Sequence, residues 1–140
     1  MQKDIQTRTA SSDDIDALLD LYAYLSPGDE RPHPEVAKEN LHKISQIAGS
    51  AVLLGLLEDT VLTTCTLIVI PNLTKAGRPY ALIENMVTHP DARGRGLGGH
   101  VLNAACDRAW LNGCYKVMLS TGSTRRSTLS FYEGAGFEQS

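Results

Sequence analysis

The feature that most constrains how this chain can fold is a glycine-rich run, Arg93-Gly94-Arg95-Gly96-Leu97-Gly98-Gly99. The run follows an apolar, strand-like stretch at residues 80–88 and precedes a helical pattern that extends to about residue 112. Glycines permit a sharp turn and leave backbone amides accessible, and the N-terminus of a helix attracts anions. The two arginines add positive charge to a chain whose net charge is −3. We therefore predict that residues 93–99 hold a phosphate group.

A dinucleotide-binding fold is one possible origin of this run, because Gly94, Gly96 and Gly99 match its G-x-G-x-x-G spacing. That fold requires an acidic residue roughly 20 positions further on, at the end of the next strand. Here the strand ends Leu119-Ser120-Thr121-Gly122, without an acid. Only about forty residues follow Gly99, too few for the rest of a doubly wound sheet. A dinucleotide-binding domain is therefore a distant alternative, and the absence of G-K-[ST] excludes a P-loop.

Periodicity predicts the order of the elements along the chain. Alternation of apolar and polar residues indicates strands, whereas apolar spacings of three and four indicate helices. The resulting order is βααβββαβαβ, a mixed α/β (α+β) fold. The predicted elements are a strand at 5–9, helices at 15–25 and 37–48, strands at 51–57, 61–70 and 80–88, a helix at 96–112, a strand at 116–120, a helix at 127–133 and a strand from 137.

Length and composition predict a single domain spanning residues 1–140. A chain of 140 residues with 42% hydrophobic residues can bury one core without disulfides or a structural metal. The negative net charge argues against nucleic acid as a partner. The longest strongly apolar stretch, residues 51–57, is far shorter than the ~20 residues that span a bilayer, and residues 1–14 lack the apolar core of a signal peptide. We expect a cytoplasmic protein that does not bind a membrane.

The cysteines and histidines predict neither a disulfide framework nor a metal site. Three cysteines without C-x-x-C spacing are typical of buried thiols in a reducing compartment. The four histidines show no H-E-x-x-H spacing and no pair four residues apart. These residues are Cys65, Cys106, Cys114, His33, His42, His89 and His100.

The turn and its surroundings resemble the GNAT superfamily of acetyl-CoA-dependent N-acetyltransferases. The pyrophosphate loop of that superfamily reads R/Q-x-x-G-x-G/A, and here it reads Arg93-x-x-Gly96-x-Gly98. The preceding strand at residues 83–88, the run 113–119 and the ending F-Y-E-G-A-G-F at residues 131–137 agree as well. The specific matches cover roughly the C-terminal sixty residues, whereas the N-terminal half is similar in its pattern of elements.

This resemblance implies a GNAT-like fold and a transfer of the acetyl group from acetyl-CoA to a primary amine of a small molecule by direct attack. It implies that Met86, Val87 and Thr88 pair through their backbone with the pantetheine arm, and that a backbone amide near Met86 or Val87 polarises the thioester carbonyl. It also implies that backbone amides in the turn hold the pyrophosphate. The residues of that turn are Arg93, Gly94, Arg95, Gly96, Leu97, Gly98 and Gly99.

Two side chains are the candidate catalytic groups. An alkylamine with a pKa of ~10.4 is neutral in only about one molecule in two thousand at pH 7, so its proton has to be removed before attack. Glu84 is the candidate base, acting through a water, and a purely structural carboxylate is the alternative. Tyr132 is the candidate acid that protonates the departing thiolate, and an aromatic packed under the last helix is the alternative. A catalytically silent CoA-binding module is the second interpretation of the whole chain.

The acceptor and the C-terminal edge are the least defined parts of this expectation. Tyr22, Tyr24, Arg31 and His33 belong to the region that covers the acceptor in related enzymes. The motifs are similar to those of small-molecule members that act on amino sugars or aminoalkylphosphonates, and the identity of the amine stays open. Seven residues before the tyrosine the family often has asparagine, whereas this chain has Arg125.

The sequence also leads us to expect a homodimer. Related domains close their sheet with a strand after the G-F pair, so in a chain that ends at Ser140 the last strand is truncated or missing. A bare sheet edge carries unpaired backbone groups that invite another chain to pair. We expect residues 116–120 and Phe137 to lie in or beside the interface.

Overall fold

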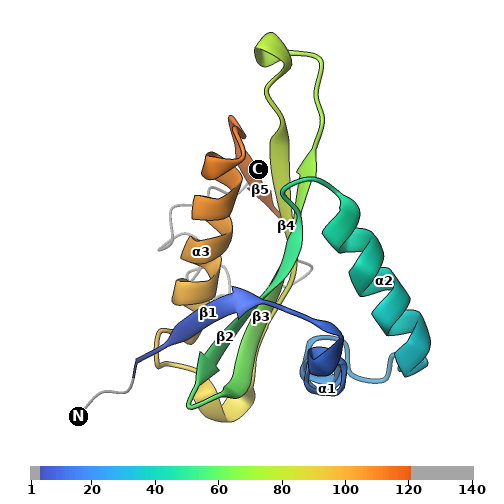
Figure 1. Cartoon of the computed structure of the whole chain (residues 1–140). Coiled ribbons are helices and arrows are strands. Elements are labelled where there is room, and N and C mark those ends of the chain that lie inside the picture. Colours follow the sequence, from blue (N-terminus) through green and yellow to red (C-terminus); the bar gives the residue numbers. More distant parts are fainter. Residues whose placement is uncertain (1–3, 121–140) are drawn as a thin grey trace.

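The computed structural model describes residues 4–120, which form one mixed sheet with helices on both faces (Figure 1). The predicted order of elements is confirmed from the first strand to β5. The predicted helix at 127–133, the strand from 137 and Phe137 lie outside the described residues, and the homodimer stays a prediction. The elements are β1 (Gln6–Thr9), α1 (Ile15–Leu25), α2 (Pro34–Gln46), β2 (Ala51–Leu57), β3 (Thr60–Ile70), β4 (Tyr80–Thr88), α3 (Leu97–Leu111) and β5 (Val117–Leu119).

The strands lie side by side in the order in which they occur in the chain, from β1 to β5. Neighbours are antiparallel except for β4 and β5, which are parallel and are joined through α3. In Figure 1, α3 covers one face of the sheet, α1 and α2 cover the other, and the β3–β4 hairpin extends beyond both layers. The sheet is thus sandwiched between one helix and a helical pair.

Each face of the sheet has its own apolar core because successive side chains of a strand point to opposite faces. On the α3 face, Leu67 and Ile83 of the strands pack with Val101 and Leu102 of the helix, all four without exposed surface. The opposite face buries a smaller cluster, in which Leu18 of α1 packs with three residues of β2, namely Val52, Leu54 and Leu56. Helix α2 buries none of its residues fully and covers this second core loosely.

Strand β4 contains a bulge, which the sequence analysis did not predict. Thr66 of β3 lies opposite Glu84, whereas Thr64 lies opposite Val87, so β4 uses one residue more than β3 over this interval. Within the bulge Asn85 has φ of 54°, a left-handed conformation that asparagine tolerates better than most residues. Pairing with β5 ends at Ile83, two residues before Asn85. The bulge therefore lies where β4 separates from the described part of β5.

The cysteines are free thiols in this structure, with Cys65 and Cys114 buried and Cys106 half-buried. Burial in the core raises the pKa of Cys65 to about 12, so this thiol stays protonated at neutral pH. Among the described residues, no three His, Cys, Asp or Glu side chains come together in a way that could bind a metal ion. None of the helices at residues 4–120 is long and apolar enough to cross a membrane.

A bidentate ion pair connects β1 to the start of α1. The guanidinium of Arg8 donates to both carboxylate oxygens of Asp14, at 2.8 and 2.9 Å, and the backbone amide of Ser11 donates to the same carboxylate at 2.8 Å. Asp14 is buried, which strengthens these contacts by excluding water. The Arg8 guanidinium holds the pKa of Asp14 below its ordinary value. This contact fixes the entry of the chain into α1.

We predict that Asp14→Asn lowers the free energy of unfolding at pH 7 by about 1–2 kcal/mol, because it removes the negative charge that pairs with Arg8 in a buried position. A carboxyl whose pKa is depressed in the folded state stabilises the fold above its unfolded pKa of about 3.9, and this contribution disappears as the pH falls through the folded value. Urea denaturation should therefore show a difference between wild type and variant that shrinks between about pH 5 and about pH 3.

The matched control for this experiment is Asp13→Asn, which changes the neighbouring exposed carboxylate. It should alter the free energy of unfolding by less than about 0.5 kcal/mol. An equal loss in both variants, or a loss in Asp14→Asn that does not depend on pH, would contradict a role for the ion pair.

Candidate active site

The glycine turn adopts the conformation that the sequence predicts, between β4 and α3. Gly94 and Gly96 have φ of 81° and 80°, values that L-residues with side chains seldom adopt. Gly96 is the N-cap of α3, so the first amides of this helix, which have no partner within the helix, face the turn. Arg93 and Arg95 are exposed beside it. The turn thus combines free amides, a helix N-terminus and two cations.

The turn also has the space that a phosphate requires. A Cβ atom added at Gly94, Gly96 or Gly99 would meet no described atom within 4 Å. At Gly94 and Gly96 the backbone conformation explains the need for glycine. Gly99 does not have a positive φ, and no described atom would clash with a side chain there. The described chain therefore gives no reason for glycine at this position. Open space beside the amides is the property expected of an anion cradle.

At the end of β4, one edge is bonded to β3 and the other has no partner strand within residues 4–120. The hydroxyl of Thr63 on β3 donates to the carbonyl of Val87 at 3.0 Å and lies 2.9 Å from the hydroxyl of Thr88. On the other side, pairing with β5 stops at Ile83, and within the described residues no strand pairs with that edge of Met86, Val87 and Thr88. These are the residues that the resemblance assigns to the pantetheine arm. Their open edge can accept an extended ligand by backbone pairing.

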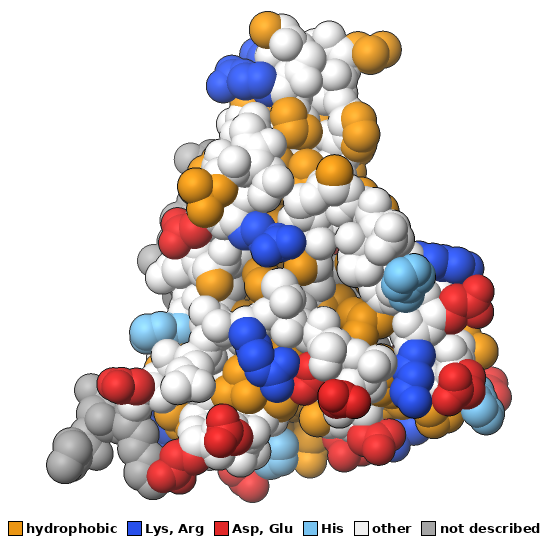
Figure 2. Space-filling model, viewed as in Figure 1, with side chains coloured by type: hydrophobic (Ala, Val, Ile, Leu, Met, Phe, Trp, Pro, Cys, Tyr) orange, Lys and Arg blue, Asp and Glu red, His pale blue; other side chains and the backbone are white. Residues whose placement is uncertain are grey.

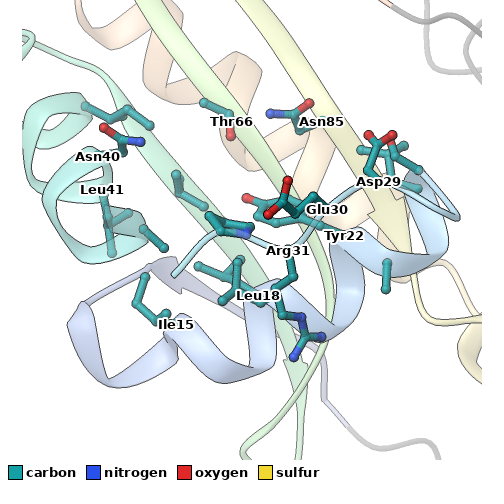
Figure 3. A pocket seen from close by; sticks show the side chains of 18 residues that line it. Ile15, Leu18, Tyr22, Asp29, Glu30, Arg31, Asn40, Leu41, Thr66 and Asn85 are labelled. Atoms are coloured by element: carbon teal, nitrogen blue, oxygen red, sulfur yellow. The ribbon is translucent and has the colours of Figure 1, made fainter. Parts of the chain in front are cut away.

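A pocket of about 400 Å³ lies between α1, α2 and the sheet. In Figure 3, Ile15, Leu18 and Leu41 form its apolar side, whereas Thr66 and Asn85 lie at its sheet side. Asn85 is the bulge residue of β4, so the pocket borders the point where β4 leaves β5. The full lining is Ile15, Leu18, Leu19, Tyr22, Ala23, Leu25, Ser26, Asp29, Glu30, Arg31, Pro32, Ala37, Asn40, Leu41, Ile44, Val52, Thr66 and Asn85.

Of the four residues expected near the acceptor, two line this pocket and two have other contacts. Tyr22 and Arg31 line it. Tyr24 instead packs edge-on against His89, with ring centroids 5.1 Å apart and its hydroxyl 3.5 Å from Nε2. His33 caps α2 by accepting a hydrogen bond from the backbone amide of Glu35 at 3.1 Å. Helical spacing places Tyr22 on the apolar face of α1 and Tyr24 on another face. No sequence pattern distinguishes the roles of Arg31 and His33, which lie in the loop after α1.

Burial raises the pKa of Tyr22, and the Thr66 hydroxyl partly offsets this effect by hydrogen bonding. Its phenol therefore remains protonated across the physiological range, as a neutral group that can donate a hydrogen bond. The phenol is a polar group at the otherwise apolar side of the pocket formed by α1.

Glu84 lies on the face of the sheet that carries the pocket. It is directly opposite Thr66, and residues opposite one another in an antiparallel pair share a face. Thr66 and the following residue, Asn85, line the pocket, whereas Glu84 itself is adjacent to the lining. Tyr132 and Arg125 lie outside the described residues.

The sequence analysis missed several residues that the fold brings to the pocket: Asp29, Glu30, Asn40, Thr66 and Asn85. Asn85 had a detectable signal, because an asparagine inside a β-rich run often marks a bulge. Thr66 lies on β3, whereas Asp29, Glu30 and Asn40 come to the pocket through the packing of α1 and α2. No local pattern distinguishes them from residues that face solvent.

Comparison with known proteins identifies a family and gives close structural matches. Residues 16–137 match the model of the acetyltransferase (GNAT) family. A putative acetyltransferase from Agrobacterium tumefaciens is 38% identical, with a TM-score of 0.89 over 96% of this chain and 94% of that one. A glucosamine 6-phosphate N-acetyltransferase from Trypanosoma brucei brucei is 29% identical over 96% of this chain and 89% of its own length. An aminoglycoside N-acetyltransferase in complex with CoA shares the fold at 15% identity, with a TM-score of 0.82 over 99% of this chain and 91% of its own.

Proposed function

Because this chain belongs to the GNAT acetyltransferase family, we propose that it transfers the acetyl group of acetyl-CoA to a primary amine of a small molecule. One observation carries the proposal. The glycine turn, the open edge of β4 and the pocket follow one another along a single strand and the helix after it. A nucleotide thioester held by the first two would present its reactive end at the bulge, beside the pocket.

The chain's own groups supply binding and orientation in this proposal. Amides of residues 93–99 bind the pyrophosphate, and the exposed guanidinium groups of Arg93 and Arg95 add charge. The open edge of Met86, Val87 and Thr88 aligns the pantetheine arm. A backbone amide near Met86 or Val87 stabilises negative charge on the carbonyl oxygen. Acetyl-CoA contributes an acetyl group already activated as a thioester.

Two side chains move protons. Before attack, Glu84 takes one proton from the ammonium form of the amine through a water. The neutral nitrogen then bonds to the carbonyl carbon and the carbon–sulfur bond breaks, while a second proton leaves nitrogen for the solvent. Its position opposite Thr66, next to the pocket lining, supports this role. Tyr132 returns a proton to sulfur, a role that rests on the F-Y-E-G-A-G-F resemblance. The phenol hydroxyl can donate a hydrogen bond to sulfur as negative charge develops there, and its proton can follow.

Binding measurements separate this proposal from its alternatives. Isothermal titration should show that acetyl-CoA and CoA bind to the full chain while NAD(P) does not, because the chain lacks the acid that would hold the ribose. A catalytically silent module would bind CoA but would not accelerate thiol release with any amine. Preferential binding of a nicotinamide dinucleotide would overturn the proposal.

Gly96→Ala tests the anion cradle, with Gly113→Ala as its matched control. Gly96 and Gly113 have nearly equal φ values, 80° and 83°, and neither added Cβ would meet a described atom within 4 Å. Both variants should lose about 1–2 kcal/mol of stability from the left-handed backbone. Titration should show weaker acetyl-CoA binding in Gly96→Ala alone. Equal affinities in the two variants would place the pyrophosphate elsewhere.

Tyr132→Phe tests the general acid. We expect kcat to fall by about 10²–10⁴-fold with nearly unchanged affinity for acetyl-CoA, because the hydroxyl acts only as charge develops on sulfur. Tyr115→Phe is the control, since that ring lies beneath the ammonium group of Lys116 at 5.5 Å, close to the β3–β4 hairpin. If kcat of Tyr132→Phe equals that of the wild type, Tyr132 is not the general acid and its role is packing.

A further inference from the structure

The pocket beside β4 has an apolar interior. Its walls include leucine and isoleucine side chains from α1 and α2, together with Val52 of β2. The polar groups at its sheet side are those of Thr66 and Asn85, and Tyr22 presents a phenol from α1 (Figure 3). An interior of this kind favours a ligand with an apolar body, because burying apolar surface away from water is favourable.

The charge around the pocket is negative. Residues 11–32, which contain α1 and its connection to α2, carry six carboxylates, of which Asp14 and Asp20 form ion pairs with Arg8 and Arg31. Asp29 and Glu30 of this segment line the pocket, and within the described residues their carboxylates have no ion pair or hydrogen bond. Figure 2 shows acidic side chains along the lower end of the molecule, which includes α1, with Lys and Arg side chains among them. Such a rim attracts cations.

The arginine that lines the pocket does not offset this charge. Arg31 forms an ion pair with Asp20 at 2.7 Å, outside the pocket lining. In Figure 3 its guanidinium points away from Thr66 and Asn85. Among the described lining residues Arg31 is the only cation. A phosphate group placed here would meet free carboxylates and no free cation of the described chain.

We propose that the acceptor is a primary amine with an alkyl or arylalkyl body and without a phosphate group, which enters this pocket as an ammonium ion. This inference rests on the proposed acetyl transfer and names its substrate class. Asp29 and Glu30 attract the ammonium form, the apolar walls take up the hydrocarbon body, and the amine reaches the sheet side of the pocket at the bulge. The class differs from that of the Trypanosoma relative, whose name specifies a sugar phosphate.

A panel of amines tests the substrate class on the full chain. Release of the CoA thiol is measured with acetyl-CoA and, in turn, 2-phenylethylamine, glucosamine and glucosamine 6-phosphate. We expect kcat/KM to be at least about tenfold higher for 2-phenylethylamine than for either sugar, the discrimination that an apolar pocket typically provides. Titration of the same amines into the chain in the presence of CoA gives a readout that does not depend on turnover.

Glu30→Gln tests the role of the rim, with Asp16→Asn as control. Glu30 is exposed and lines the pocket, whereas Asp16 is an exposed carboxylate of α1 that does not. Removing the Glu30 charge should raise the KM for 2-phenylethylamine about two- to fivefold at unchanged kcat, as expected for a partly exposed charge contact. Asp16→Asn should leave both constants unchanged.

The outcomes distinguish the substrate class from the reaction. A higher kcat/KM for glucosamine 6-phosphate would overturn the proposed class and leave acetyl transfer in place. Failure of all three amines to react or bind, in a chain that binds acetyl-CoA, would also overturn the class. A chain that does not bind acetyl-CoA would overturn the proposed function itself.

Discussion

The bulge in β4 is the constraint on which the rest of the site depends. The strand pairs with β3 along its length but with the described part of β5 only as far as Ile83. An extra residue at this point increases the local twist and redirects the strand. Asn85 takes the left-handed conformation that the bulge requires. A regular β4 without the bulge would continue in the same direction and could keep pairing with β5 beyond Ile83. The edge on which we place the thioester would then be occupied.

Strand β4 therefore contributes to the core, to the pocket and to the link with the glycine turn. Before the bulge, Ile83 anchors β4 in the core beneath α3. At the bulge, Asn85 borders the pocket formed with α1 and α2. Beyond it, Val87 is held from the β3 side by Thr63, and the chain continues into the glycine turn. The rigid sheet therefore fixes the distance between the anion cradle and the pocket, whereas the loosely packed α2 leaves room for acceptors to differ.

The sequence predicted the parts of this arrangement that follow from local chemistry. Periodic apolar residues predicted the elements to within a few residues, and glycines between a strand and a helix predicted the turn. The pocket could not be predicted in this way, because it depends on how two helices pack across a sheet. The helical period places Tyr22 and Tyr24 on different faces of α1, but it does not predict that Tyr22 lines a pocket or that Tyr24 contacts His89. The carboxylates of Asp29 and Glu30 have no partner within residues 4–120, and only the folded chain shows this.

The central claim is that one open edge of β4 and the turn after it bind the same ligand. Backbone hydrogen exchange of the chain with and without CoA tests this most directly, because exchange reports the protection of individual amides. The account predicts that CoA slows exchange together at residues 86–88 and 94–99, and leaves the hairpin between β2 and β3 unchanged. Saturating CoA that protects neither segment, or protects only amides on the opposite side of the sheet, would contradict it.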